Sequence, residues 1–286
     1  MRRLLLLLAV LAVACGDGPE TIVVGSKNFT EQRILGELLA QTLENAGFPV
    51  RRRLDLGGTF VCDAALRSGQ IDVYVEYTGT ALRAILQEEA GGGDAASVLA
   101  RVRGRYAEAG LTWLDPLGFD NTFALVVRGD EAPETISAAV APARDWRAAV
   151  GYEFEQRADG LPALRRTYDL AFADIRTMDL GLLYQALSDR QVDLVVGSAT
   201  DGLIDALGLK MLADDRGAFP PYEAVPVARG DTLARHPVAE RALRALGGRL
   251  DAKAMRWLNH GVDGARRSPA KVVEGWLGNA PRSGID

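Results

Sequence analysis

The feature that most constrains the fold of this chain is a weak internal repeat. Residues 65–66 and 71–75 (AL and IDVYV) recur as residues 186–187 and 192–196 (AL and VDLVV), 121 positions further on in both blocks. Matches this short also arise by chance between unrelated segments, so coincidence stays open as an explanation. The repeat favours two similar lobes within one chain.

The hydrophobic pattern indicates an α/β architecture in each lobe, because short β-branched runs alternate with amphipathic stretches. Each copy of the repeat is read as strand, helix, strand, helix, strand, which forms its own parallel sheet. Residues 30–45 predict a helix that Gly47 ends, and residues 232–277 predict several short helices. The expected strands are 21–25, 50–56, 71–75, 111–114, 122–128, 150–154, 174–178, 192–196, 210–213 and 224–229.

The first residues are typical of a targeting signal. Arg2 and Arg3 precede an apolar run, residues 4–14, that is too short to span a bilayer as a helix. Small residues then stand directly before Cys15, as in a bacterial lipobox, so we expect a signal peptide over 1–14 and lipidation of Cys15. The alternative is an ordinary secretory signal cut near Ala14; either signal predicts an exported protein.

Composition argues against several classes of function. With 33 basic and 38 acidic residues the formal charge is -5, which gives no general attraction to nucleic acid. Two cysteines and two histidines leave little material for a disulfide framework or a metal site, so we expect no cofactor.

Catalysis finds little support in the motifs. The sequence has no Gly-x-Ser-x-Gly elbow, phosphate-binding loop or His-Glu-x-x-His pair. Cys62 is a possible nucleophile, yet its apolar neighbours are more typical of a cysteine packed in a core. An exported enzyme that uses Cys62 is therefore a less favoured alternative.

Open α/β sheets bind ligands beyond the carboxyl ends of their strands, where two lobes share a crevice. The stretches that follow the expected strands are rich in hydroxyl, amide and aromatic side chains, which suits a small polar ligand with an apolar cation. Gly57-Gly58-Thr59 has two readings: an anion site at a helix N-terminus, or a tight turn with Thr59 as the cap. The candidate stretches are residues 26–32, 57–59, 76–80, 121–123, 198–201 and 219–222.

Several of these motifs together resemble a known family, the glycine betaine/carnitine/choline substrate-binding lipoproteins of osmoprotectant ABC importers. The resemblance rests on GSKNFTEQ at 25–32, GGT at 57–59, IDVYVEYTGT at 71–80, TDG at 200–202, and DD at 214–215 before FPPY at 219–222. It implies a two-lobed type II periplasmic-binding-protein fold of the α/β class, with two crossover segments. It also places lobe 1 at 20–117 and 218–286, and lobe 2 at 118–217.

The same resemblance implies a set of ligand-binding residues. An aromatic box would surround the quaternary ammonium, whose methylated cation is stabilised by ring faces. Tyr77, Phe123 and Tyr222 match the box, and Ser198 stands where a fourth ring would be. The polar end of the ligand would meet Gln32, Thr80 and Asn121, with Ser26, Thr59 and Thr200 as further contacts.

The function implied is binding without chemistry. The ligand bridges both lobes, and a membrane permease of the ABC type recognises the closed form. Because Thr80 is neutral, a zwitterion such as glycine betaine is favoured over choline. A lipid-tethered monomer is the simplest assembly, and a binding protein for another small solute, such as a cationic amino acid, is the alternative.

Overall fold

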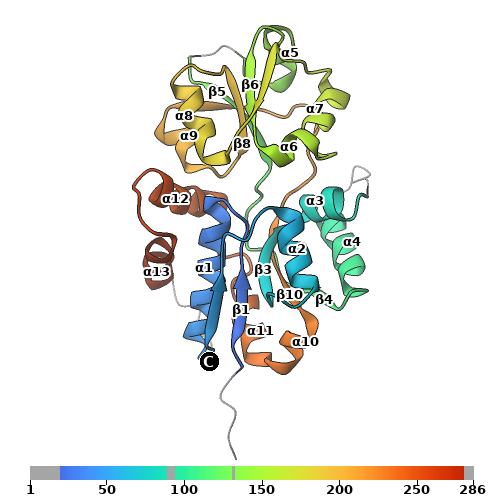
Figure 1. Ribbon diagram of the computed structural model, residues 1–286, viewed down its shortest axis with the longest axis vertical. Coiled ribbons are helices and arrows are strands. Elements are labelled where there is room, and N and C mark those ends of the chain that lie inside the picture. The colour runs from blue at the N-terminus through green and yellow to red at the C-terminus, as the bar shows by residue number, and fades with distance from the viewer. Residues whose placement is uncertain (1–19, 89–93, 131–132, 280–286) are drawn as a thin grey trace, which may run out of the picture.

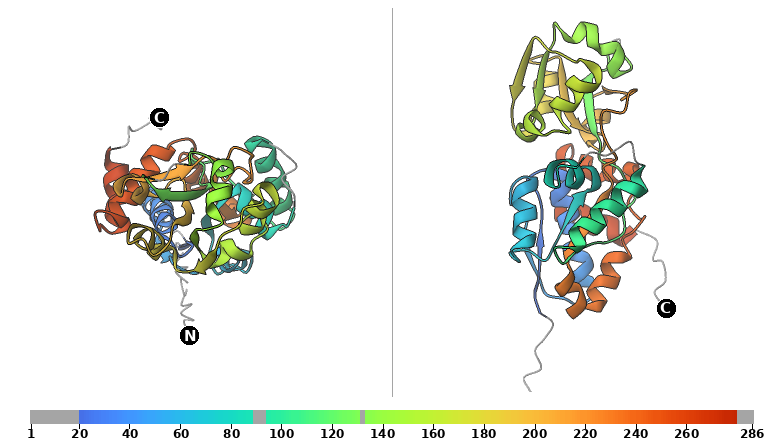
Figure 2. Two further views of the ribbon diagram at one scale, coloured as in Figure 1. Left: turned by 90° about the horizontal axis from the view of Figure 1, so that it is seen from above. Right: turned by 90° about the vertical axis from the view of Figure 1, so that its right-hand side faces the viewer.

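Two lobes lie end to end in the computed structural model, which describes residues 20–88, 94–130 and 133–279 (Figures 1 and 2). Cys15 and the expected signal peptide lie outside the described residues. Each lobe is built on one five-stranded sheet with helices on both faces, so the predicted two-lobed α/β fold is confirmed. In the part of the chain that the structure describes, no helix is both long and apolar enough to cross a membrane.

The sheet of the first lobe has the strand order β2-β1-β3-β10-β4. Strands β1, β2 and β3 run parallel, whereas β10 is antiparallel to both β3 and β4. The bounds are β1 Ile22–Gly25, β2 Val50–Arg53, β3 Val73–Tyr77, β4 Leu111–Trp113 and β10 Ala224–Arg229.

The sheet of the second lobe repeats this arrangement in the order β7-β6-β8-β5-β9. Here β6, β7 and β8 run parallel, and β5 is antiparallel to its neighbours β8 and β9. The bounds are β5 Phe123–Arg128, β6 Arg147–Val150, β7 Asp174–Thr177, β8 Leu194–Ser198 and β9 Leu209–Leu212. Strands β5 and β10 are thus equivalent, and each is the strand that receives the chain after it crosses between lobes.

The helices cover both faces of the two sheets and form the C-terminal region (Figure 1). Lobe 1 holds α1 Thr30–Asn45, α2 Thr59–Arg67, α3 Thr78–Thr80, the π-helical turn η1 Ala81–Ile85 and α4 Ala95–Ala107. Lobe 2 holds α5 Ile136–Ala143, α6 Tyr152–Gln156, α7 Leu161–Tyr168, the 3₁₀ turn η2 Leu180–Leu182, α8 Leu183–Ser188 and α9 Gly202–Ala206. The C-terminal helices are α10 Gly230–Arg235, α11 Pro237–Arg244, α12 Ala252–Asp263 and α13 Pro269–Asn279.

The long helix α1 has the bounds expected from its apolar periodicity. Ile34, Leu35, Leu38 and Leu39 are buried in the lobe core against β1 and β3. Gly47 adopts a φ of +90° just beyond the helix, a conformation that glycine reaches without steric cost. The helix thereby holds the residues of its first turn at the edge of the sheet that faces lobe 2.

The sequence repeat has a structural cause in two aspartates. In lobe 1, Asp72 Oδ2 accepts a hydrogen bond from the backbone N–H of Val23 at 2.8 Å. In lobe 2, Asp193 Oδ2 accepts from the backbone N–H of Arg147 at 3.0 Å. Each aspartate therefore ties the strand that it precedes to the neighbouring parallel strand, β1 in lobe 1 and β6 in lobe 2, which explains why an acidic residue recurs at this position.

One expected strand is wrong. The sequence predicted a strand over 150–154, but β6 ends at Val150 and α6 begins at Tyr152. Gly151 is the extended N-cap residue, and Glu153 and Glu155 lie in the first turn, where negative charge stabilises a helix N-terminus. Phe154, whose apolar side chain suggested the end of a strand, lies on this helix and is buried in the core of lobe 2.

The chain passes between the lobes twice, through residues 114–122 and 213–223. The two passages are paired by an isolated antiparallel bridge between Asp120 and Glu223. A third connection comes from α12, which packs on α9 of lobe 2 so closely that a Cβ atom on Gly202 would lie 2.4 Å from the backbone nitrogen of His260. Lobe 2 is therefore held by the two passages and by a helix of the C-terminal region.

Candidate functional site

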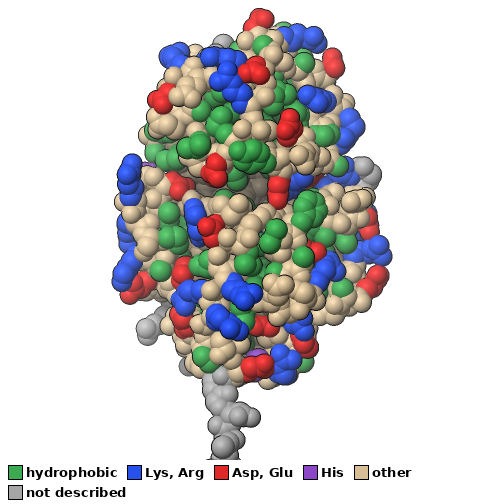
Figure 3. Space-filling view, viewed as in Figure 1, with side chains coloured by type: hydrophobic (Ala, Val, Ile, Leu, Met, Phe, Trp, Pro, Cys, Tyr) green, Lys and Arg blue, Asp and Glu red, His purple; other side chains and the backbone are tan. Residues whose placement is uncertain are grey.

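The carboxyl ends of β1, β3, β6 and β8 face one another across the junction of the two lobes (Figure 1). The expected site residues end or follow β1, β2, β3 and β8, begin β5, or lie in the two passages, so the fold brings them to this junction. On the face seen in Figure 3 a furrow separates the lobes, with acidic and basic side chains along its margins. The site is thus a crevice with a contribution from each lobe.

Four aromatic rings meet at the junction. The Phe123 ring lies 4.8 Å from Phe154, 5.4 Å from Phe219 and 5.3 Å from Tyr222, measured between ring centroids. Phe123 and Tyr222 were expected together from the sequence, whereas Phe154 was not, because its segment was read as a strand. Three segments distant in sequence therefore supply one aromatic cluster: the start of β5, helix α6 and the return passage.

Arg157, just after α6, places a cation on this cluster. Its guanidinium carbon lies 5.3 Å from the centroid of Phe123, and its Nη2 donates to Thr80 Oγ1 at 3.1 Å. Asp159, which is buried, accepts from Arg157 Nη2 at 2.6 Å and from the Tyr222 hydroxyl at 2.7 Å. Sequence reasoning missed both charged residues, since no motif marks them.

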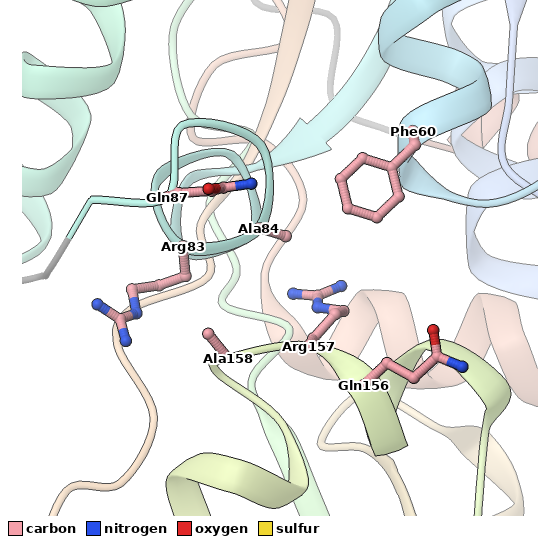
Figure 4. Close-up of a pocket in the computed structure, with 7 residues that line it drawn as sticks. All are labelled: Phe60, Arg83, Ala84, Gln87, Gln156, Arg157 and Ala158. Atoms are coloured by element: carbon pink, nitrogen blue, oxygen red, sulfur yellow. The ribbon is translucent and has the colours of Figure 1, made fainter.

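A cavity of about 300 Å³ opens beside Arg157 at the edge of the junction. Figure 4 shows the guanidinium between Phe60 of α2 and Ala84 of η1, with Gln156 projecting from α6. The wall is formed by both lobes, and none of the ten residues expected from the sequence lines it. Its residues are Phe60, Arg83, Ala84, Gln87, Gln156, Arg157 and Ala158.

The Gly57-Gly58-Thr59 turn before α2 holds an anionic group from the other lobe. The backbone N–H of Thr59 donates to Glu153 Oε1 at 3.1 Å, and a Cβ on Gly58 would lie 1.8 Å from that oxygen. A helix N-terminus favours negative charge, so the turn does accept a carboxylate. In this structure the carboxylate belongs to lobe 2.

The Thr59 side chain is part of a buried polar cluster in lobe 1. Lys27 Nζ donates to Thr59 Oγ1 at 3.0 Å and forms an ion pair with Glu76 Oε1 at 2.6 Å. Both charged side chains are almost fully buried, and Tyr74 donates a further hydrogen bond to Glu76. Lys27 Nζ also lies 5.1 Å from the Tyr77 ring centroid, so a cation already occupies one side of that ring.

Glu31 is the centre of a second buried cluster that joins the two lobes. Its carboxyl accepts hydrogen bonds from the Tyr77 hydroxyl at 2.6 Å, from Asn121 Nδ2 at 2.8 Å and from Asn259 Nδ2 at 3.2 Å, and it contacts the Thr200 hydroxyl. Burial raises the pKa of Glu31 from 4.5 to about 7; the hydrogen bonds from Thr200 and Tyr77 oppose this rise. Three expected ligand residues thus bind a carboxyl group of the chain itself.

The remaining expected residues have varied surroundings. The Ser26 hydroxyl donates to the carbonyl of Lys27 and accepts from the backbone N–H of Asp55, both at 3.0 Å, which stabilises the turn after β1. Gln32 is fully buried, and its Nε2 has no hydrogen-bond partner. Ser198 lies opposite Phe123 in the β5–β8 ladder, so no ring faces Phe123 from that position.

Cys62 is buried in the core of lobe 1 on α2. Burial raises the pKa of its thiol to about 12, so the thiol is protonated at neutral pH. Among the described residues, no group of three or more His, Cys, Asp or Glu side chains is arranged to hold a metal ion.

Two sheets of matched topology, joined by two passages around a polar and aromatic crevice, define the class of two-lobed substrate-binding proteins. Residues 20–279 match the family described as the substrate binding domain of ABC-type glycine betaine transport systems. The chain belongs to this family, as the resemblance of its motifs predicted.

Relatives over nearly the full length agree with this assignment. The chain is 37% identical to the glycine-betaine-binding protein of Pseudomonas aeruginosa, over 97% of this chain and 93% of that protein. It is 34% identical to the carnitine transport binding protein OpuCC of Listeria monocytogenes, over 92% and 87%. A crystal structure of a glycine betaine/carnitine/choline ABC transporter protein has a TM-score of 0.76 and 29% identity, over 90% of this chain and 97% of that one.

Proposed function

We propose that this protein is the extracytoplasmic binding component of an ABC importer for a quaternary ammonium osmoprotectant, with a preference for betaine-like zwitterions. The ligand binds in the crevice between the lobes, which close on it and present the closed form to a permease in the cytoplasmic membrane. Lipidation of Cys15 would tether the protein as a monomer, with lobe 2 at 118–217 and lobe 1 on either side of it. Binding, rather than catalysis, is its role.

The observation that carries the proposal is the aromatic cluster with a cation already on it. The guanidinium of Arg157 lies over Phe123, whose neighbours are Phe154, Phe219 and Tyr222. A trimethylammonium group is stabilised by such ring faces, at roughly 0.5–2 kcal/mol for each favourable contact. It donates no conventional hydrogen bonds, so apolar ring faces suit it well.

The other end of a zwitterion has suitable partners nearby. Thr80 is neutral and accepts from Arg157, so a ligand carboxylate placed there would meet a hydroxyl and a guanidinium. Hydrogen bonds between a guanidinium and a carboxylate are charge-assisted and comparatively strong. This arrangement supports a ligand with a carboxylate over choline, which has none.

The remaining expected residues enter the proposal with different weights. Gln32 Nε2 is a buried donor without a partner, which supports a contact with the ligand. Tyr77, Asn121 and Thr200 bond Glu31 at the same junction, while Ser26 follows β1, Thr59 begins α2 and Ser198 ends β8.

Isothermal titration of the chain without residues 1–15 tests the proposal, with glycine betaine, choline, carnitine and arginine as ligands. We expect a trimethylammonium compound to bind and Tyr222→Ala to remove most of the binding heat. Tyr222→Phe is the matched control, because it keeps the ring and removes only the hydroxyl that bonds Asp159. Binding of arginine alone, or of none of the four by folded protein, would show that the proposed ligand class is wrong.

A further inference from the structure

The Glu31 cluster consists of Glu31, Tyr77, Asn121, Thr200 and Asn259. Its members come from α1, the end of β3, the first passage, the loop after β8, and α12. Thr200 is the member from lobe 2, and its backbone carbonyl also accepts from Asn259 Nδ2 at 2.8 Å. Any separation of the lobes at this point must therefore break hydrogen bonds to Thr200.

Counting protons in the cluster indicates which form of Glu31 fits it. The Thr200 oxygen lies within hydrogen-bond distance of Glu31 Oε2 and 3.1 Å from Asn121 Oδ1. A hydroxyl has one proton, so beside an ionised Glu31 it serves only one of these two acceptors. If Glu31 is protonated, it donates to Thr200 while Thr200 donates to Asn121, and both contacts are satisfied.

The charges around the cluster favour the same form. Tyr77 faces Glu31 from β3, and the negative charge of Asp201, beside Thr200, raises the pKa of Glu31 further. On α12, the Asp263 carboxylate accepts a hydrogen bond from the Thr30 hydroxyl. On α1, Arg33 is nearby, and its Nη1 lies 3.7 Å from Asp55 Oδ1. Lys27, the cation on the other side of Tyr77, forms its ion pair with Glu76.

We propose that Glu31 is a positioning residue that couples closure of the lobes to the uptake of one proton from solvent. In the closed form Glu31 is neutral and donates to Thr200; in the open form Thr200 has withdrawn, water reaches the carboxyl group and Glu31 ionises. The proposal rests on the function proposed above, because ligand binding is what drives closure.

The direction of the pH effect follows from linkage. Where closing raises a carboxyl pKa, the closed form holds more protons, so ligand affinity increases as the pH falls from about 7 toward 4.5. With an ordinary pKa in the open form, affinity at pH 5.5 exceeds that at pH 7.5 by about twentyfold at most. A tightening of about tenfold is the expected order.

Titration calorimetry at pH 6 in two buffers of different ionisation enthalpy measures the protons taken up per ligand. Choline and glycine betaine are the probes. We expect between about one half and one proton for the wild-type protein and clearly less for Glu31→Gln, which keeps Asp201, a carboxyl beside Thr200 whose pKa burial raises to about 6. Glu37→Gln is the matched control on the same helix, because Glu37 bonds Arg52 instead, and it should keep the wild-type uptake. No uptake by wild type, or undiminished uptake by Glu31→Gln, would overturn the proposal.

A second measurement tests this proposal without any ligand, so its result does not depend on which solute the protein binds. It also does not require the Glu31→Gln variant to fold. Spin labels at Ala100→Cys in lobe 1 and Ala141→Cys in lobe 2, with Cys15→Ser, report the distance between lobes without ligand. We expect this distance to lengthen between pH 5.5 and 7.5, and Thr200→Val to give the long distance at both values. A distance that is independent of pH in the protein with Thr200 intact would contradict the coupling, whichever solute the crevice binds.

Discussion

Strands β3 and β8 are equivalent in the two sheets, yet they end in different chemistry. Their ranges, Val73–Tyr77 and Leu194–Ser198, differ by the same 121 positions as the sequence repeat, so Glu76 and Tyr77 correspond to Gly197 and Ser198. Lobe 1 presents a buried carboxylate and an aromatic ring at the crevice. Lobe 2 presents a glycine and a serine at the equivalent positions. The same strand topology therefore places different side chains on the two sides of the crevice.

The difference arises from what fills the space behind each strand end. In lobe 1, Glu76 is neutralised by Lys27, which reaches it from the loop after β1. In lobe 2, the space beside Gly197 is taken by Tyr184, whose hydroxyl contacts Asp201. Lobe 2 supplies its crevice cation, Arg157, from the residue after α6, whereas Lys27 of lobe 1 lies in the loop directly after β1. The repeat thus preserves the strands and their pairing but not the crevice residues.

The largest expected effect comes from breaking the buried ion pair of lobe 1. Lys27→Met leaves Glu76 buried without its cation, so we expect the free energy of unfolding to fall by about 3–5 kcal/mol. Urea denaturation measures this change. The comparison in lobe 2 is Arg147→Met, since Arg147 pairs with Asp193 at 3.0 Å but is 40% exposed. A loss there of about 1 kcal/mol or less is expected, and equal losses in the two lobes would contradict the contrast.

A smaller effect is expected from adding a side-chain carbon to Gly197, where Tyr184 already fills the neighbouring space. A Cβ on Gly197 would lie 2.0 Å from the Tyr184 hydroxyl and 2.8 Å from Asp201 Oδ2. We therefore expect Gly197→Ala to destabilise the protein by about 1–3 kcal/mol, seen as a lower thermal midpoint.

The control for that substitution is Gly104→Ala in α4, where nothing lies within 4 Å of the added Cβ. Alanine has the higher helix propensity, so this variant should gain up to about 1 kcal/mol of stability. If both alanine variants shift the thermal midpoint in the same direction, the close packing around Gly197 does not exclude a larger residue at this position.

The smallest expected effect tests whether lobe 2 can be given the ring that lobe 1 carries. Ser198→Tyr would add an aromatic side chain opposite Phe123 in the ladder. We expect quaternary ammonium affinity to increase by about 0.5–2 kcal/mol, or twofold to thirtyfold, in a calorimetric titration. Ser198→Leu adds bulk without a ring face, so a similar gain from leucine would show that burial rather than the ring is responsible.

Much of the fold was predictable, because it depends on local patterns. Nine of the ten expected strands share at least three residues with an observed strand, and helix α1 has the expected bounds. The exception, 150–154, was misread because Val150 and Phe154 are apolar and the helical signal of Glu153 and Glu155 lies between them. Because of that error the sequence analysis missed two residues of the site, Phe154 in α6 and Arg157 directly after it.

The candidate site was only partly predictable. Phe123 and Tyr222 meet in one cluster, but Tyr77, Asn121 and Thr200 surround Glu31, which the sequence placed within a candidate stretch without a role. Its position in the GSKNFTEQ run was the signal available. For Arg157 and Asp159 no comparable signal exists.

The sequence by itself determined the two α/β lobes, the segments that end at their junction and the membership of a binding-protein family. Periodicity along the chain encodes which face of each element is apolar, and this is sufficient to assign strands, helices and their ends. Only the tertiary structure decided which side chains face a ligand and which face one another. Glu31 and Thr200 are 169 positions apart, and their contact depends on how two lobes and α12 pack, which no local pattern records.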